Sequence, residues 1–135
     1  KPDWLSMMIG INDVWRQFDA ARHPEKHVRL DEYAATCDRL IGGIRPHLKG
    51  LVLMSPYFIE PNREEPMRKM MDQYGAVVKQ TAEKYDGIFV DVQAAFDDVL
   101  EQAHPMVLAG DRVHPGQAGH MVITRAFLKA IDFEW

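Results

Sequence analysis

The stretch WLSMMIGIND, residues 4–13, decides the fold, because it joins an apolar run of strand length to a glycine and two polar residues. We expect the first strand over residues 4–9. Two further apolar runs cover residues 51–54 and 88–92. Their continuous apolar character predicts strands that are buried on both faces, as in a parallel sheet.

Helical patterns lie between these runs and after them. Apolar residues recur at spacings of three and four over residues 31–48, where Pro46 is expected near the helix end, and again over residues 66–85. A shorter helix is expected over residues 93–102, and a last one follows Gly116 and runs to about residue 131. This alternation of strands and helices predicts an α/β domain, a parallel three-layer αβα sandwich with right-handed crossovers.

Several side chains are expected in the core of that sandwich. Trp4 and Ser6 lie within the first strand, and Tyr57 and Phe58 follow the second. Cys37 falls on the apolar face of a helix, which favours a buried, inert thiol over a catalytic one.

Composition narrows the class of protein further. The chain has 135 residues, enough for one domain with a modest core, and a net charge of -4. Its basic residues are scattered, so no nucleic-acid interface is expected, and no apolar run approaches the length of a membrane span. The one cysteine, Cys37, excludes an internal disulfide and favours a reducing compartment such as the cytoplasm.

The domain is expected to be partial. The chain opens with Lys1-Pro2-Asp3 and enters the apolar run at once, which is neither a signal peptide nor an initiator methionine. Three strands are also few for a sheet that carries helices on both faces. We therefore expect residues 1–135 to form a single domain whose first one or two strands precede Lys1.

The first motif with chemical meaning is Gly10-Ile11-Asn12-Asp13, directly after the first strand. In parallel sheets, functional groups gather at the carboxyl ends of the strands. Gly10 lets the chain turn off the sheet, and the neutral amide of Asn12 can donate to an oxyanion that develops in a transition state. Gly10 and Asp13 would then have structural roles beside it. The alternative is an ordinary turn at a strand end.

The second motif is Asp111-Arg112-Val113-His114-Pro115-Gly116, in the loop before the last helix. An aspartate three residues before a histidine can bond its Nδ1, which leaves Nε2 free to act as a base. The alternative is a solvated loop histidine next to an acid that caps a helix.

Together, the two motifs resemble the third and fifth sequence blocks of the SGNH, or GDSL, hydrolase superfamily. In that family a serine nucleophile stands in a Gly-Asp-Ser block near the N-terminus, and a glycine of the second block and the asparagine of the third help complete the oxyanion hole. The resemblance implies a flavodoxin-like fold. It also implies that Asn12 is an oxyanion donor, Asp111 the orienting acid and His114 the base, with no metal or organic cofactor.

Longer stretches resemble one branch of that family, the bacterial GDSL esterases of the acetylxylan esterase type. They are MIGINDVWRQF (8–18), MRKMMDQYG (67–75), DRVHPGQAGH (111–120) and the ending FEW (133–135). The resemblance extends over essentially all 135 residues. It implies a serine esterase that removes acetyl groups from carbohydrate, with an acetylated sugar or another small ester as its substrate.

The serine block and the second-block glycine of that family have no counterpart here. We therefore expect the nucleophilic serine upstream of Lys1, and the 135-residue chain by itself to be inactive. Ser55 ends a strand but lacks the G-x-S-x-G elbow that would expose its hydroxyl, so a strand-end cap is the favoured interpretation.

Other residues leave alternatives open. Trp15 and Arg16, expected on a loop near the site, either line a sugar pocket or serve in packing and a surface ion pair. His104, Asp111, His114 and His120 fall within a short span, but no pair has the helix spacing of a zinc motif. Three hypotheses therefore stand: a serine esterase, a metal-dependent hydrolase, and an α/β binding module without activity. A homo-oligomer is possible in each case.

Overall fold

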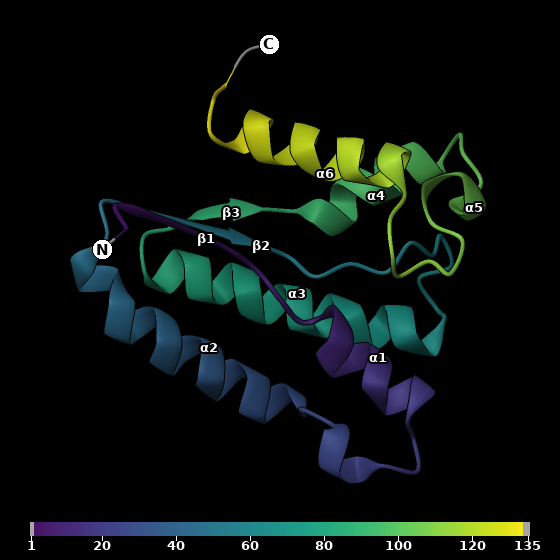
Figure 1. Ribbon diagram of the computed structural model, residues 1–135, viewed down its shortest axis with the longest axis horizontal. Coiled ribbons are helices and arrows are strands. Elements are labelled where there is room, and N and C mark those ends of the chain that lie inside the picture. The colour runs from purple at the N-terminus through teal and green to yellow at the C-terminus, as the bar shows by residue number, and fades with distance from the viewer. Residues whose placement is uncertain (1, 134–135) are drawn as a thin grey trace.

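Three parallel strands form the middle layer of the computed structural model, which describes residues 2–133 (Figure 1). They are β1 (Trp4–Met8), β2 (Gly50–Met54) and β3 (Ile88–Val90), in the spatial order β1-β2-β3. Leu5 pairs with Leu51, and Val52 pairs with Ile88 on the other side of β2. The parallel sheet and its central second strand confirm the predicted α/β class.

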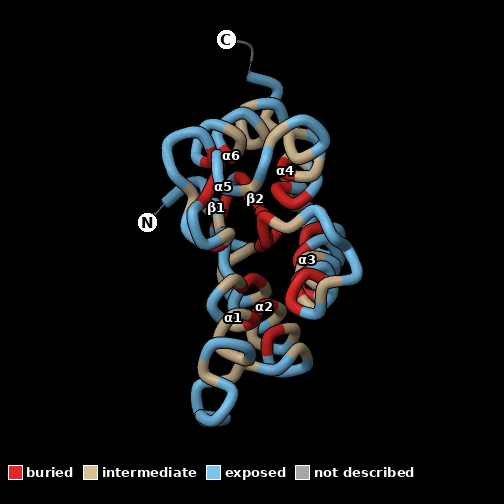
Figure 2. Tube along the Cα trace, turned by 90° about the vertical axis from the view of Figure 1, so that its right-hand side faces the viewer, coloured by how far each residue is buried: buried red, intermediate tan, exposed pale blue. Residues whose placement is uncertain are grey.

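Two groups of helices cover the sheet, one on each side (Figures 1 and 2). One group holds α1 (Ile11–Asp19), α2 (Leu30–Ile44) and α3 (Pro66–Lys84). The other holds α4 (Val92–Leu100), α5 (Pro105–Leu108) and α6 (Gln117–Ala130). Short 3-10 turns lie at Pro24–Lys26 (η1) and at Arg45–His47 (η2), where the turn that contains Pro46 follows α2. The layers are those of the predicted αβα sandwich.

The alternation of side chains along β2 divides the core into two clusters. Leu51 and Leu53 belong to the cluster on the side of α1, α2 and α3, whereas Val52 and Met54 belong to the cluster on the side of α4 and α6. All five residues of β2 are buried, because helices cover both of its faces (Figure 2). This is the pattern that a continuous apolar run predicts for a central parallel strand.

Three of the core predictions are confirmed and two are wrong. Cys37 is 1% exposed, and Tyr57 and Phe58 are buried. Trp4, however, is 57% exposed, and Ser6 is exposed as well. The physical reason is that these residues alternate along β1 and point to the same face as Val52 of β2, and the helices that cover Val52 do not extend over β1.

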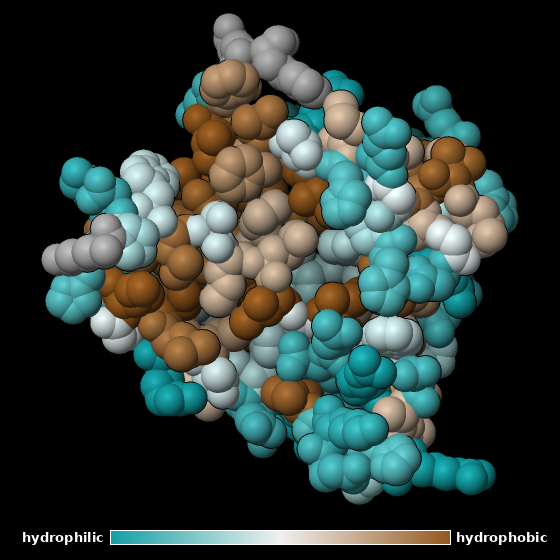
Figure 3. All heavy atoms as spheres, viewed as in Figure 1, coloured by the Kyte–Doolittle hydropathy of each residue, from teal (hydrophilic) through white to brown (hydrophobic). Residues whose placement is uncertain are grey.

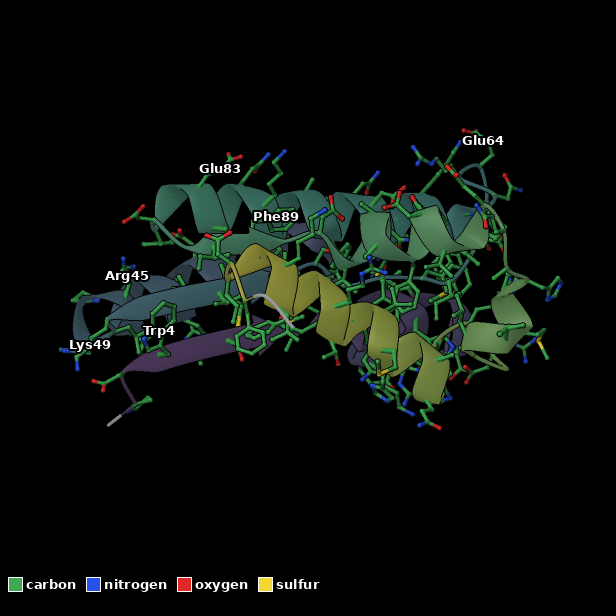
Figure 4. The ribbon with its side chains drawn as sticks, turned by 90° about the horizontal axis from the view of Figure 1, so that it is seen from above. Trp4, Arg45, Lys49, Glu64, Glu83 and Phe89 are labelled. Carbon is green, nitrogen blue, oxygen red and sulfur yellow. The ribbon has the colours of Figure 1, made fainter. Side chains whose placement is uncertain are left out.

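The exposed side of β1 is apolar. Trp4 lies against the sheet near Gly50, where an added Cβ atom would fall 2.2 Å from the indole ring (Figure 4). Met8 and Ile9 are also more than a third exposed, and Figure 3 shows apolar residues gathered over this part of the molecule. Apolar residues on both faces of a strand favour packing layers on both sides. Among the described residues, only β2 has both of its faces covered.

The structure also contains two helices that the sequence did not predict, α1 and α5. Gly, Asn and Asp at residues 10–13 favour a turn, but the residues after them have a helical apolar face. Ile11, Val14, Trp15 and Phe18 recur at helix spacing, and Val14 is fully buried. Val92, predicted at the end of the third strand, begins α4 instead. In the described part of the chain, no helix is long and apolar enough to cross a bilayer.

Candidate active site

Asp111 and His114 form a hydrogen-bonded pair in the loop between α5 and α6. Oδ2 of Asp111 lies 2.7 Å from Nδ1 of His114, and Oδ1 accepts from the backbone N–H groups of Val113 and His114 at 3.0 and 2.8 Å. The bond from His114, and then the two backbone bonds, hold the pKa of Asp111 well below its usual range. The aspartate is therefore a carboxylate that accepts three bonds from its own loop.

The pair is open to solvent on its outer side. The side chains of His114 and Asp111 are 67% and 53% exposed. Since Nδ1 is occupied by the carboxylate, Nε2 of His114 lies on the side of the ring away from Asp111. An imidazole held in this way can take a proton from a group that approaches from outside the loop.

The loop that carries the pair is anchored at several points. Val113 is buried in the core cluster on the side of α1, α2 and α3, and the N–H of Gly116 donates to the carbonyl of Leu108 at 2.8 Å. Arg112 adopts a φ of +64°, and its carbonyl accepts from the N–H of Ile59 at 3.1 Å. These contacts hold an irregular segment in one conformation.

Gly10 occupies a position that a larger residue would not fit. Its φ is +124°, and a Cβ atom there would lie 2.9 Å from Oη of Tyr33 and 3.0 Å from Cγ of Pro56. Tyr33 fills this space because its hydroxyl donates to the carbonyl of Ile9 at 2.9 Å. The glycine therefore allows the chain to leave β1 and begin α1 within two residues.

Asn12 and Asp13 lie in the first turn of α1. Asn12 is exposed, at the helix end that favours negative charge. Asp13 is partly buried, and burial raises its pKa, although a bond from its own backbone N–H acts in the opposite direction and Glu32 adds to the rise. Asn12 thus faces solvent, whereas Asp13 is partly covered by the protein.

Trp15 joins the two motifs. Its ring meets the imidazole of His114 edge-on, with ring centroids 5.5 Å apart and an angle of 82° between the planes. Asn12 and Trp15 are three positions apart on α1 and share one side of the helix. The helix therefore brings the glycine-asparagine motif to the loop that holds Asp111 and His114, and Figure 1 shows that loop extending from α6 past the sheet edge toward α1.

Arg16 contacts residues of its own helix. Its guanidinium lies 4.7 Å from the centroid of the Trp15 ring, and it forms an exposed ion pair with Asp19 at 3.0 Å. The prediction that Trp15 and Arg16 lie on a loop is wrong, because both are within α1. The surface ion pair that the sequence allowed for Arg16 is present.

Ser55 caps the start of α4. It is 2% exposed, and its Oγ accepts from the backbone N–H groups of Val92 and Gln93 at 2.9 and 3.2 Å. The prediction was a cap at the strand end; the hydroxyl of Ser55, which follows β2, instead caps the first turn of the neighbouring helix α4. A hydroxyl that is buried and already holds two donors is not presented to a substrate.

Two further histidines of the predicted metal span, His104 and His120, lie away from the pair in the secondary structure. Nδ1 of His104 accepts from the N–H of Met106 at the start of α5, and His120 lies on α6. Within residues 2–133, no group of three or more His, Cys, Asp and Glu side chains is arranged to hold a metal ion.

One contact of the loop has no signal in the sequence. The guanidinium of Arg112 bonds to the carboxylate of Glu60, and its Cζ lies 4.9 Å from the ring centroid of Phe58. Both partners come from the segment after β2, far away in the chain. Neither spacing nor composition indicates such a pair, which depends on how two loops meet.

The fold is shared with known proteins. Residues 1–122 match the GDSL-like lipase/acylhydrolase family. The chain is 58% identical over all 135 residues to an acetylxylan esterase of Geobacillus stearothermophilus and spans 62% of the length of that enzyme. The crystal structure of this enzyme superposes on the whole chain with a TM-score of 0.98.

A second solved structure is similar as well. An α/β hydrolase from the metagenome of Lake Arreo is 52% identical, and the match covers 98% of this chain and 61% of that one, with a TM-score of 0.96. Crystal structures of catalytic mutants of the Geobacillus enzyme, at one serine, one aspartate and one histidine, are also known, and the last two stand three positions apart. The parallel αβα sandwich of this chain is thus the SGNH hydrolase fold, and the chain belongs to the GDSL-like lipase/acylhydrolase family.

Proposed function

We propose that this chain is the C-terminal part of a serine esterase that removes acetyl groups from carbohydrate. The observation that carries the proposal is the bond between Asp111 and His114, 2.7 Å long, beside the helix that holds Asn12. The relative named an acetylxylan esterase, 58% identical along the whole chain, supports the substrate class. The catalytic mutants of that relative include an aspartate and a histidine with the same spacing.

In the proposed reaction, a serine hydroxyl from a segment upstream of residue 1 attacks the carbonyl carbon of the ester. Nε2 of His114 takes the serine proton, and Asp111 stabilises the imidazolium through Nδ1. The amide of Asn12 donates to the oxygen that becomes negative in the tetrahedral intermediate. When the intermediate collapses, the sugar oxygen leaves with the proton from His114, and the acetyl group stays on the serine.

Water completes the cycle. It attacks the acetyl-serine while His114 takes one of its protons, and a second tetrahedral intermediate again places its oxyanion at Asn12. Collapse releases acetate and returns the proton to the serine. No metal or organic cofactor takes part in these steps. Since the serine is not among residues 1–135, this chain alone is expected to hydrolyse no ester.

The uncovered edge of β1 supports an upstream segment that completes the sheet. Parallel strands continue a sheet by pairing along such an edge, and the exposed apolar side chains of Trp4, Met8 and Ile9 flank it. In this proposal, the segment that covers the edge also supplies the serine, which would then lie at the same end of the sheet as Gly10.

The test uses the full-length protein with p-nitrophenyl acetate and an acetylated xylo-oligosaccharide. His114→Ala is expected to remove almost all activity while the protein stays folded, because the imidazole is exposed. His120→Ala, at an exposed histidine of α6, serves as the control and should be silent. Added chelator should have no effect.

Other outcomes favour the rival hypotheses. Loss of activity with chelator would favour a metal-dependent hydrolase. No hydrolysis of either ester by the folded full-length protein would favour a binding module without activity. Saturable hydrolysis by the isolated 135-residue chain would contradict the upstream serine.

A further inference from the structure

We propose that Glu60 is a positioning residue, which holds the loop of Asp111 and His114 in its working conformation through an ion pair with Arg112. This inference rests on the proposed esterase function. It begins from the backbone of Arg112, whose φ of +64° lies in the left-handed region. A residue with a side chain holds this conformation only when its surroundings compensate for a cost of about 1–2 kcal/mol.

Those surroundings come from one short segment. The carboxylate of Glu60 accepts from the guanidinium of Arg112, whose Cζ lies 4.9 Å from the ring centroid of Phe58. The N–H of Ile59 donates to the backbone carbonyl of Arg112. The Glu60 side chain is only 13% exposed, whereas that of Arg112 is 43% exposed. A charge-assisted bond to a largely buried carboxylate is stronger than one between solvated groups.

The segment that holds Arg112 is itself rigid. The N–H of Phe58 donates to Oε1 of Gln93 at 2.7 Å, and Nε2 of Gln93 donates back to the carbonyl of Phe58 at 3.1 Å. The carbonyl of Glu60 accepts from Nη1 of Arg68 at 2.7 Å, and Arg68 bonds both oxygens of Asp97 at 2.9 and 2.7 Å. Since Arg68 is 3% exposed, these bonds anchor the segment to α3 and α4.

The consequence falls on Asp111 and His114, which stand on either side of Arg112 in the loop. The left-handed turn at Arg112 lets Oδ1 of Asp111 reach the N–H groups of Val113 and His114, while Oδ2 reaches Nδ1 of the same histidine. The side chains of Asp111 and His114 are more than half exposed, so their positions depend strongly on the backbone of the loop. Release of Arg112 should therefore loosen the pair without removing either member.

The experiment measures kcat and KM of the full-length enzyme on p-nitrophenyl acetate. Glu60→Gln is expected to lower kcat about tenfold and to change KM less than twofold, because substrate binding does not depend on the pair. Glu64→Gln is the matched control, because this carboxylate lies on the same segment, pairs with Lys69 and is 79% exposed. Figure 4 shows its side chain pointing outward. It should leave both constants unchanged.

A double-mutant cycle separates positioning from simple loss of structure. In the Asp111→Asn background, Glu60→Gln should cost less than a further twofold in kcat, because the pair it positions is already broken. The activity that triads retain without one member keeps this rate measurable. Arg112→Ala, which removes the ion pair but leaves a side chain at the positive φ, should lower kcat as Glu60→Gln does, and the two changes together should cost no more than one.

Three results would overturn the inference: a kcat of Glu60→Gln within twofold of the wild type, an undiminished tenfold loss in the Asp111→Asn background, or full activity of Arg112→Ala. The last decides the matter if Glu60→Gln fails to fold. The esterase proposal is tested separately, because Asp111→Asn and His114→Ala without effect would contradict it whatever the result for Glu60→Gln.

Discussion

The indole of Trp15 meets the imidazole of His114 edge-on, with the two ring centroids 5.5 Å apart. Trp15 follows the Gly10–Asp13 motif on α1, and His114 belongs to the motif near the other end of the chain. Their contact brings the two motifs together in one site. Contacts of this kind contribute about 0.5–1.5 kcal/mol beyond burial. The indole also limits how far the exposed imidazole can turn about its bond to Asp111.

Replacement of Trp15 should therefore affect the rate. We expect Trp15→Ala to lower kcat/KM of the full-length enzyme about tenfold, and Trp15→Phe to retain most of it, because a phenyl ring keeps an aromatic edge toward the imidazole. Phe18→Ala, at a 40% exposed aromatic residue of the same helix, is the control. If Trp15→Ala lost no more than Phe18→Ala, the contact would have no part in catalysis.

Asn12 should act on the transition state alone. Asn12→Ala is expected to reduce kcat by roughly 10²- to 10³-fold with KM nearly unchanged, because the oxyanion exists only after the carbonyl is attacked. Steady-state kinetics on an activated and a natural ester measure both constants. A loss that appeared wholly in KM, or an unfolded variant, would reassign Asn12 to the turn after β1.

Asp111 should matter through the tautomer of His114. Asp111→Asn keeps the size of the side chain but favours a ring with Nδ1 accepting and Nε2 protonated, which cannot take the serine proton. Activity should fall by up to roughly 10⁴-fold on a folded protein. If Asp111 only caps a turn, the change should be nearly silent, because asparagine caps about as well. Measurement with and without EDTA also tests the metal hypothesis.

The same residue should give the stability of the protein a pH dependence. The pKa of Asp111 is lowered on folding, so its contribution to the free energy of unfolding is present above the unfolded-state value of 3.8 and is lost as the pH falls below it. Urea unfolding of wild type and Asp111→Asn should therefore differ at pH 6 and converge toward pH 2. A difference that stayed constant over this range would contradict the lowered pKa.

Two glycines provide a matched test of the turn after β1. Gly10→Ala should lower the free energy of unfolding by about 1–3 kcal/mol, because φ is +124° and the new Cβ atom meets Tyr33 and Pro56. Gly43→Ala, within α2 and with nothing within 4 Å of its Cβ position, should raise it by about 0.5–1 kcal/mol. Equal effects of the two changes would show that Gly10 is not needed for its conformation.

Much of this arrangement is local in the chain, and the sequence predicts what is local. The apolar run of β2 has helices over both faces, and the spacing of apolar residues gives α2, α3, α4 and α6 within a few positions. The bond of Asp111 to His114 also spans only three residues, so its two partners can meet whatever the rest of the chain does. Periodicity and short-range hydrogen bonding are sufficient for each of these.

The tertiary structure decided the features that depend on which segments pack together. Residues 11–19 have turn formers at their start, and the packing of Val14 and Trp15 against the core stabilises them as the helix α1. The apolar run of β1 predicts burial, yet Trp4 is exposed, since burial requires a neighbour that residues 2–133 do not supply. The contacts of His114 with Trp15 and of Arg112 with Glu60 join residues that are distant in sequence. No local rule fixes such distances, because they follow from the packing of whole helices and loops against the sheet.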